Sequence, residues 1–127
     1  MIQRDVEQWG VARLLIDQRR VTVRLSALEM LEAFHLNVTV PRTAVIAARA
    51  VPDGMAELRG MALGTGMGTG TGLPGVMMVG TIRDGYGLTF AVCRGSGPAV
   101  VLDLAGHTYD RIVVTVADPG AIVRRLP

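Results

Sequence analysis

Lysine is absent from this sequence, and all thirteen basic residues are arginine. Schiff-base chemistry and the phosphate-binding lysine of a P-loop are therefore excluded. The single cysteine, Cys93, excludes an intramolecular disulfide and a multi-cysteine zinc site, and it agrees with a reducing compartment. With one tryptophan, two tyrosines and two phenylalanines, the chain has too few aromatic residues for a base-stacking surface.

Charge is also sparse. The net charge of +2 gives no electrostatic argument for nucleic acid as a partner. The N-terminus is charged and lacks the apolar core of a signal peptide. The longest uncharged run, residues 60–82, holds eight glycines and four threonines, whereas a membrane-spanning helix is predominantly apolar. We therefore predict a cytoplasmic protein with no nucleic-acid partner and no transmembrane segment.

The length of 127 residues predicts one domain, because a second would be too small to bury its own core. Half of the residues are hydrophobic, and the mean hydropathy is +0.39. Either the many glycines, alanines and valines raise this average, or a large apolar face meets a partner. Homo-oligomerisation therefore stays open.

Alternating apolar and polar residues predict that most of the chain is extended. Residues 12–17 and 21–25 alternate in this way around a short connection, which predicts a hairpin. Asp84-Gly85 predicts a second hairpin. Strands are expected at 38–40, 45–51, 76–83, 86–93, around 100–104 and around 112–116, with a turn at 52–54. The fold class is mainly β, with about seven antiparallel strands.

Two short helices are expected beside these strands. Ser26 and Glu29 form a capping box, and apolar residues then recur at helical spacing, which predicts a helix over 27–35. Asp118 is a good N-cap and Pro119 suits the first helical position, which predicts a C-terminal helix over 119–126.

Glycine occupies every second position from Gly64 to Gly72. Interior glycines disfavour a helix by about 1 kcal/mol each relative to alanine. The sequence therefore predicts a glycine-rich loop over 60–75, of a length that is usually functional or mobile. The candidate functional residues of this loop are Gly64, Gly66, Gly68, Gly70, Gly72 and Gly75.

The order of strands, meander and C-terminal helix resembles pleckstrin-homology-like domains, in which two bent sheets are capped by the last helix. Several short motifs also resemble a family of small actinobacterial proteins without an assigned biochemical function. These motifs are Leu25-Ser-Ala-Leu-Glu29, Val38-Thr-Val-Pro41, Arg59-Gly60, Gly70-Thr-Gly-Leu-Pro-Gly75, Gly80-Thr81 and the stretch from Tyr109 to Pro119. The resemblance implies a pleckstrin-homology-like barrel, or two packed bent sheets, over the whole chain.

No set of residues has the spacing of a catalytic, cofactor or metal site. Residues 70–75 match the letters of the dinucleotide fingerprint, but a strand rather than a helix is expected after them. Cys93, His107 and Asp103 are the residue types that serve as thiol nucleophile, base and orienting acid in catalysis, yet nothing in the sequence pattern places them close together. His35 and His107 lack a third metal ligand. We therefore expect no catalytic residue, no cofactor and no metal.

Carboxylates offer no acid–base pair either. Glu29 and Glu32 lie three residues apart on the first predicted helix, and Asp103 and Asp110 flank a turn. We interpret both pairs as solvated charges rather than as groups with a raised pKa. Ser96 lies in Gly-Ser-Gly and is interpreted as a turn residue, because a nucleophile elbow needs a helix after it.

The candidate anion-binding or lipid-binding residues are Arg13, Arg19, Arg20 and Arg24 on the first hairpin. Arg13 and Arg24 are expected on the outward face of their strands, and the other two at the turn. The resemblance supports a phospholipid site at this hairpin, since pleckstrin-homology domains that bind inositol phospholipids use a basic first hairpin. Asp17 neutralises part of this charge.

These observations predict a non-catalytic binding module whose partner is a protein or a second copy of the chain. Strand addition to an open sheet edge would need only backbone groups. Two alternatives remain open. One is a small-ligand carrier or enzyme with the glycine-rich loop as a lid, and the other is attachment to anionic phospholipid through the first hairpin. A barrel interior filled by aliphatic and aromatic side chains would favour the binding module over the carrier.

Overall fold

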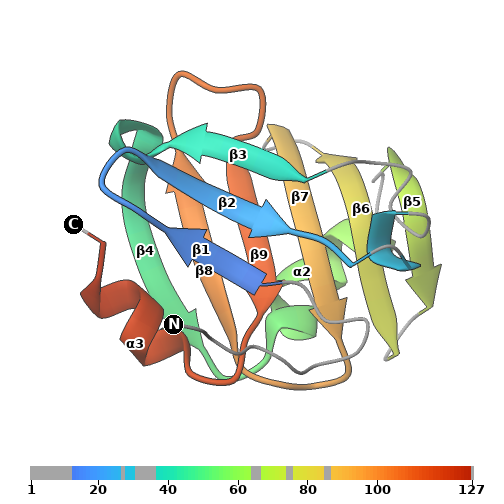
Figure 1. Cartoon of the computed structure of the whole chain (residues 1–127). Helices are drawn as coiled ribbons and strands as arrows, with labels where there is room; N and C mark the ends of the chain where they lie inside the picture. Colours follow the sequence, from blue (N-terminus) through green and yellow to red (C-terminus); the bar gives the residue numbers. More distant parts are fainter. Residues whose placement is uncertain are drawn as a thin grey trace.

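The computed structural model describes residues 13–26, 28–30, 37–63, 67–73, 76–84 and 87–126. Within these ranges the chain is mainly β, and nine strands form one three-stranded and one six-stranded sheet (Figure 1). No pairing between described strands closes either sheet into a barrel. The prediction of a mainly β fold is therefore confirmed, and the structure has two sheets rather than a closed barrel.

The three-stranded sheet contains the predicted first hairpin. Strands β1 (Arg13–Ile16), β2 (Arg20–Arg24) and β3 (Val38–Pro41) pair antiparallel in this order. Their apolar residues alternate with polar ones, so one face of the sheet is apolar. This face buries Leu14, Ile16, Val21, Val23, Val38 and Val40.

The six-stranded sheet has the order β4-β8-β9-β7-β6-β5. Its strands are β4 (Val45–Val51), β5 (Met67–Leu73), β6 (Met77–Asp84), β7 (Gly87–Arg94), β8 (Ala99–Leu104) and β9 (Arg111–Thr115). Strand β9 lies between β8 and β7 and pairs parallel with β7. The prediction of antiparallel strands throughout was therefore wrong at this pair, because a meander would have placed β8 beside β7.

The central strands of this sheet are buried on both faces, and the two faces differ in side-chain size. Large residues such as Phe90, Leu102 and Ile112 pack between the two sheets. Small residues such as Ala91 and Ala99 lie on the opposite face. The six-stranded sheet is therefore the middle layer of the molecule, with the three-stranded sheet in front of it and a helix behind it (Figure 1).

That helix is α2 (Gly54–Leu63), which the sequence reading missed because a turn and then a loop were expected there. Two local signals could have found it. The Asp53 carboxylate accepts hydrogen bonds from the backbone N–H groups of Met55, at 3.0 Å, and Ala56, at 3.3 Å, as an N-cap does. Met55 and Leu58 are buried at helical spacing. Gly54 and the small sheet residues together let α2 approach the sheet closely. A Cβ added at Gly54 would lie only 2.7 Å from the Ala99 Cβ.

The predicted loop over 60–75 is wrong for most of its length. Helix α2 continues to Leu63, and Met67–Leu73 forms β5, which pairs antiparallel with β6. Gly70 and Gly80 are partners in this ladder. A Cβ on Gly70 would overlap the carbonyl oxygen of Val79, and Gly70 has a φ of +141° that side-chain-bearing residues rarely adopt. Here glycine allows two backbones to approach closely within a sheet.

The C-terminal helix is confirmed as α3 (Pro119–Arg124), two residues shorter than predicted. The Asp118 side chain caps it by accepting from the Ala121 N–H at 3.1 Å. Helix α3 contacts β4, and Ile122 packs against the core between the sheets. Of the predicted helix over 27–35, residues 28–30 are helical, and the others lie outside the described residues.

Candidate functional site

The candidate arginines of the first hairpin lie where the alternation predicted. Arg13 and Arg24 are exposed and directly opposite each other in the register of β1 and β2. Arg20 is exposed at the other end of β2, opposite Pro41. The outward face of the three-stranded sheet is therefore basic, but its arginines are divided between the two ends of the hairpin.

The turn of this hairpin is organised by Asp17. Its carboxylate accepts hydrogen bonds from the backbone N–H groups of Arg19, at 2.7 Å, and Arg20, at 2.8 Å. These two bonds lower the pKa of Asp17, with a smaller contribution from the neighbouring arginine charges. The carboxylate is thus bound to backbone N–H groups of the turn, and the Arg19 and Arg20 side chains extend from an ordered loop.

Two further arginines join this turn from distant parts of the chain. Arg42, in the 3-10 helix η1 (Arg42–Ala44), donates to the carbonyl of Asp17 at 3.1 Å and also to the carbonyl of Arg125. Arg125 in turn donates to the carbonyl of Ile16 at 3.0 Å. These bonds fasten the end of α3 to the hairpin. Both residues were missed in the sequence analysis because each lies far along the chain from its acceptor. Arg42 is 25 residues from Asp17, and Arg125 is 109 residues from Ile16, so no local pattern relates them.

The structure does not bring Cys93, His107 and Asp103 together. Cys93 is buried beneath α2, and this burial raises the pKa of its thiol to about 12. His107 lies in the connection from β8 to β9, where its Nδ1 accepts from the Tyr109 N–H at 3.2 Å. Because β9 starts beside the start of β7, this connection and Cys93 lie at opposite ends of β7. Asp103 instead pairs with Arg111 at 3.4 Å.

The remaining chemical candidates do not form a site in the described part of the chain. Ser96 lies in the turn between β7 and β8, as predicted. No cluster of three or more histidine, cysteine, aspartate or glutamate residues that could hold a metal occurs among the described residues. His35 and Glu32 lie outside those residues.

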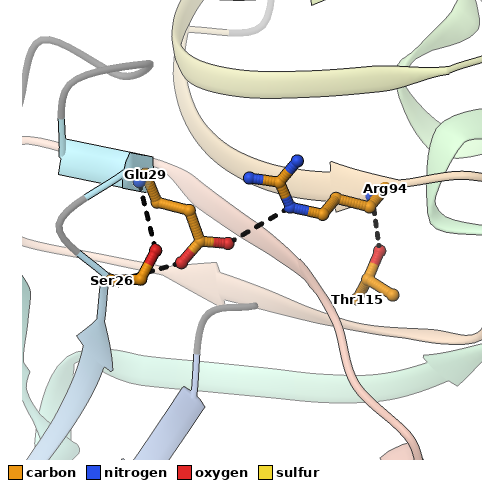
Figure 2. A network of polar contacts seen from close by, with 4 residues as sticks. All are labelled: Ser26, Glu29, Arg94 and Thr115. Carbon is orange, nitrogen blue, oxygen red and sulfur yellow. Dashed lines mark hydrogen bonds and ion pairs between the residues drawn. The ribbon is translucent and has the colours of Figure 1, made fainter. Parts of the chain in front are cut away.

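A buried carboxylate joins the first helical turn to the six-stranded sheet (Figure 2). The predicted capping box is confirmed: the Ser26 N–H donates to Glu29 Oε1 at 3.0 Å, and the Glu29 N–H donates to Ser26 Oγ at 3.2 Å. The other oxygen, Oε2, accepts from Arg94 Nε at 3.4 Å. Arg94 in turn donates its backbone N–H to Thr115 Oγ1 at 3.1 Å.

The prediction that Glu29 is solvated was wrong, since its side chain has 0% exposure. Both of its oxygens are engaged, one by a backbone N–H and one by a guanidinium. Through these two contacts Glu29 links the first helical turn to the six-stranded sheet. The partner could not be read from the sequence, because Arg94 lies 65 residues away.

The two edges of the six-stranded sheet differ in how they are covered. Strand β4 is one edge, and α3 packs against it (Figure 1). Strand β5 is the other edge, and no described strand pairs with its outer side. The sequence of β5, MGTGTGL, contains no charged residue and no proline. The candidate glycines Gly68, Gly70 and Gly72 lie in this edge strand, while Gly64, Gly66 and Gly75 lie outside the described residues.

Comparisons with known proteins do not identify a family for this chain. No protein-family model matches the chain, and neither the curated proteins nor the solved structures give a match. Among the described residues, no helix is both long enough and apolar enough to cross a membrane.

Proposed function

We propose that this protein is a non-catalytic binding module that takes up a protein partner by strand addition at the β5 edge. The observation that carries this proposal is the character of that edge among the described residues: its outer side is unpaired, and it has neither charge nor proline. Sheet edges present a row of backbone N–H and C=O groups that bind another strand. Charge, proline and bulges are the usual means of preventing such pairing.

The layers behind β5 make it a firm support for a partner strand. Strand β6 pairs along the whole of β5, and β7 pairs along the whole of β6. The three-stranded sheet and α2 bury the two faces of the central strands. A partner strand would therefore add to an edge whose backbone is already fixed, which reduces the entropy lost on binding.

The interior supports a binding module over a carrier. The space between the sheets is filled by aliphatic and aromatic side chains, of which Phe90, Val100, Leu102 and Ile112 have 0% exposure. Of the glycine-rich residues that would have formed a lid, Met67–Leu73 are instead paired in the sheet as β5. A ligand pocket needs converging polar groups in a cavity, and this interior is packed as a core.

Site-specific photocrosslinking in the cells that make the protein tests strand addition. Val76 is 56% exposed in the connection from β5 to β6, directly before β6 begins, and Ile46 is 65% exposed on the opposite edge strand, β4. A photoreactive amino acid at Val76 should give a discrete protein adduct, and the matched substitution at Ile46 should not. Adducts from both positions, or from neither, would contradict binding at the β5 edge.

The basic sheet face supports a second candidate, attachment to anionic phospholipid. Arg13 and Arg24 are both exposed and lie directly opposite each other, which places two positive charges together at one end of the hairpin. None of the described residues that point outward from this sheet is acidic. An anionic surface would therefore meet arginines at both ends of the hairpin.

Flotation with phosphatidylcholine vesicles containing about 20% phosphatidylserine tests this candidate. Binding should be lost on combined Arg19→Gln and Arg20→Gln substitution, and it should weaken as salt is raised. The turn should survive, because Asp17 holds the backbone N–H groups of these residues. Arg49→Gln, which removes an exposed arginine from β4, is the matched control. Equal binding by all three proteins, or none by the unaltered protein, would exclude the lipid candidate.

A further inference from the structure

The edge strand β5 has a sequence that is nearly the same in both directions. From Met67 to Leu73 it is MGTGTGL, so an apolar residue stands at each end and glycine and threonine alternate symmetrically about Gly70. A strand with this symmetry can pair antiparallel with an identical strand so that equivalent residue types oppose each other. Glycine would oppose glycine, threonine would oppose threonine, and methionine would oppose leucine.

We propose that the partner of the β5 edge is a second copy of this chain, related by a two-fold axis at Gly70. This inference rests on the strand addition proposed above. In this register Thr69 opposes Thr71 of the second copy, and Thr71 opposes Thr69. A two-fold contact of this kind uses the same surface on both copies and closes on itself. Threonine pairs across antiparallel strands are favourable.

Charge and backbone both allow two copies to meet along this strand. Each chain carries a net charge of +2, yet residues 60–82 contain no charged residue, so no arginine of this stretch opposes another at the contact. At the axis, the two Gly70 residues place no side chain on either face of the sheet, so no side chains clash across the contact there. The pairing would join two six-stranded sheets into one continuous sheet across the dimer.

The size of this contact sets its strength. A strand of seven residues is about 24 Å long, and its edge covers less surface than a standard interface. We therefore expect a weak dimer that dissociates at micromolar concentrations rather than a permanent one. Sedimentation velocity over a concentration series gives the dissociation constant.

A charge exchange within β5 tests both the partner and the position of the axis. Thr69→Glu with Thr71→Glu places like charges in both threonine pairs, and it should raise the dissociation constant by about tenfold or more. Thr69→Glu with Thr71→Arg instead places opposite charges in both pairs, and it should restore dimerisation to within about threefold of the unaltered protein. This restoration is specific to an axis at Gly70, because an axis at residue 69 would oppose glutamate with glutamate.

A mixing experiment separates loss of pairing from loss of folding. The double-glutamate protein and a Thr69→Arg, Thr71→Arg protein should each be monomeric, with urea midpoints close to that of the unaltered protein. An equimolar mixture should form a heterodimer, since opposite charges then meet in every threonine pair. A mixture that stays monomeric, although both proteins are folded, would overturn the second-copy inference.

The crosslinking experiment distinguishes failure of this inference from failure of strand addition itself. An adduct from Val76 with twice the 13.5 kDa mass of the chain supports both proposals. An adduct with a different protein, together with a monomer in sedimentation, overturns the second copy and retains strand addition. A monomer in sedimentation with no adduct from Val76 overturns both.

Discussion

Replacing Phe90 by alanine should lower the free energy of unfolding by about 3–5 kcal/mol, the range for removing a buried aromatic side chain. Phe90 has 0% exposure and lies on β7, where it packs between the two sheets. Its ring centroid is 5.5 Å from that of Tyr109, in a tilted arrangement. Truncation would lose this contact and leave a cavity that the paired strands on either side of β7 can close only in part.

Urea denaturation of the purified protein measures this loss. A domain of ordinary stability unfolds with about 5–15 kcal/mol, so the change would remove a large fraction of the total. Leu15→Ala is the control, because Leu15 is also apolar but is 44% exposed on the outward face of β1. We expect the control to lose less than about 1 kcal/mol. Equal losses for the two variants would show that Phe90 does not lie in the core between the sheets.

Replacing Glu29 by alanine should cost about 2–3 kcal/mol of unfolding free energy. The substitution removes the capping-box oxygen that accepts from the Ser26 N–H, and it leaves Arg94 without this carboxylate. Breaking a fully buried ion pair typically costs more, but the Arg94 side chain is 27% exposed and can turn partly to water. Thermal or urea unfolding, followed by circular dichroism, measures the change.

Two further variants identify the origin of this effect. Glu57→Ala removes the acid of a 3.3 Å ion pair with Arg49. The Glu57 side chain is 28% exposed and the Arg49 side chain 44% exposed, so the loss of unfolding free energy should be no more than about 1 kcal/mol. The Glu29 pair is almost the same length, at 3.4 Å, so burial is the difference between them. Glu29→Gln keeps an oxygen for the Ser26 N–H and loses the charge, so its effect should be intermediate. Similar losses for Glu29→Ala and Glu57→Ala would contradict the buried network.

Features that depend on near neighbours were predictable from the sequence. Alternation located β1, β2 and β3 because a half-buried strand shows its two faces directly in its residues. The Ser26–Glu29 capping box and the Asp118 cap were predictable because their bonded groups lie only three residues apart. The outward positions of Arg13 and Arg24 follow from the same alternation.

Helix α2 and strand β5 show where this reading fails. The sequence signal of glycine is its missing side chain, which is compatible with a flexible loop or with a close contact. At Gly54 and Gly70 the structure uses it for close contact, against Ala99 in one case and the β6 backbone in the other. Only the opposing surface distinguishes the two uses, and that surface comes from elsewhere in the chain.

The sequence by itself determined the mainly β class, the first hairpin, the caps at Ser26 and Asp118, and the lack of lysine and disulfide chemistry. The tertiary structure decided that β9 lies parallel to β7, that Glu29 meets Arg94, and that β5 forms an edge of the six-stranded sheet. The physical reason is how far apart along the sequence the interacting residues lie. Caps and alternation are set by bonds and faces within a few residues, whereas strand order and buried pairs depend on which distant surfaces pack together.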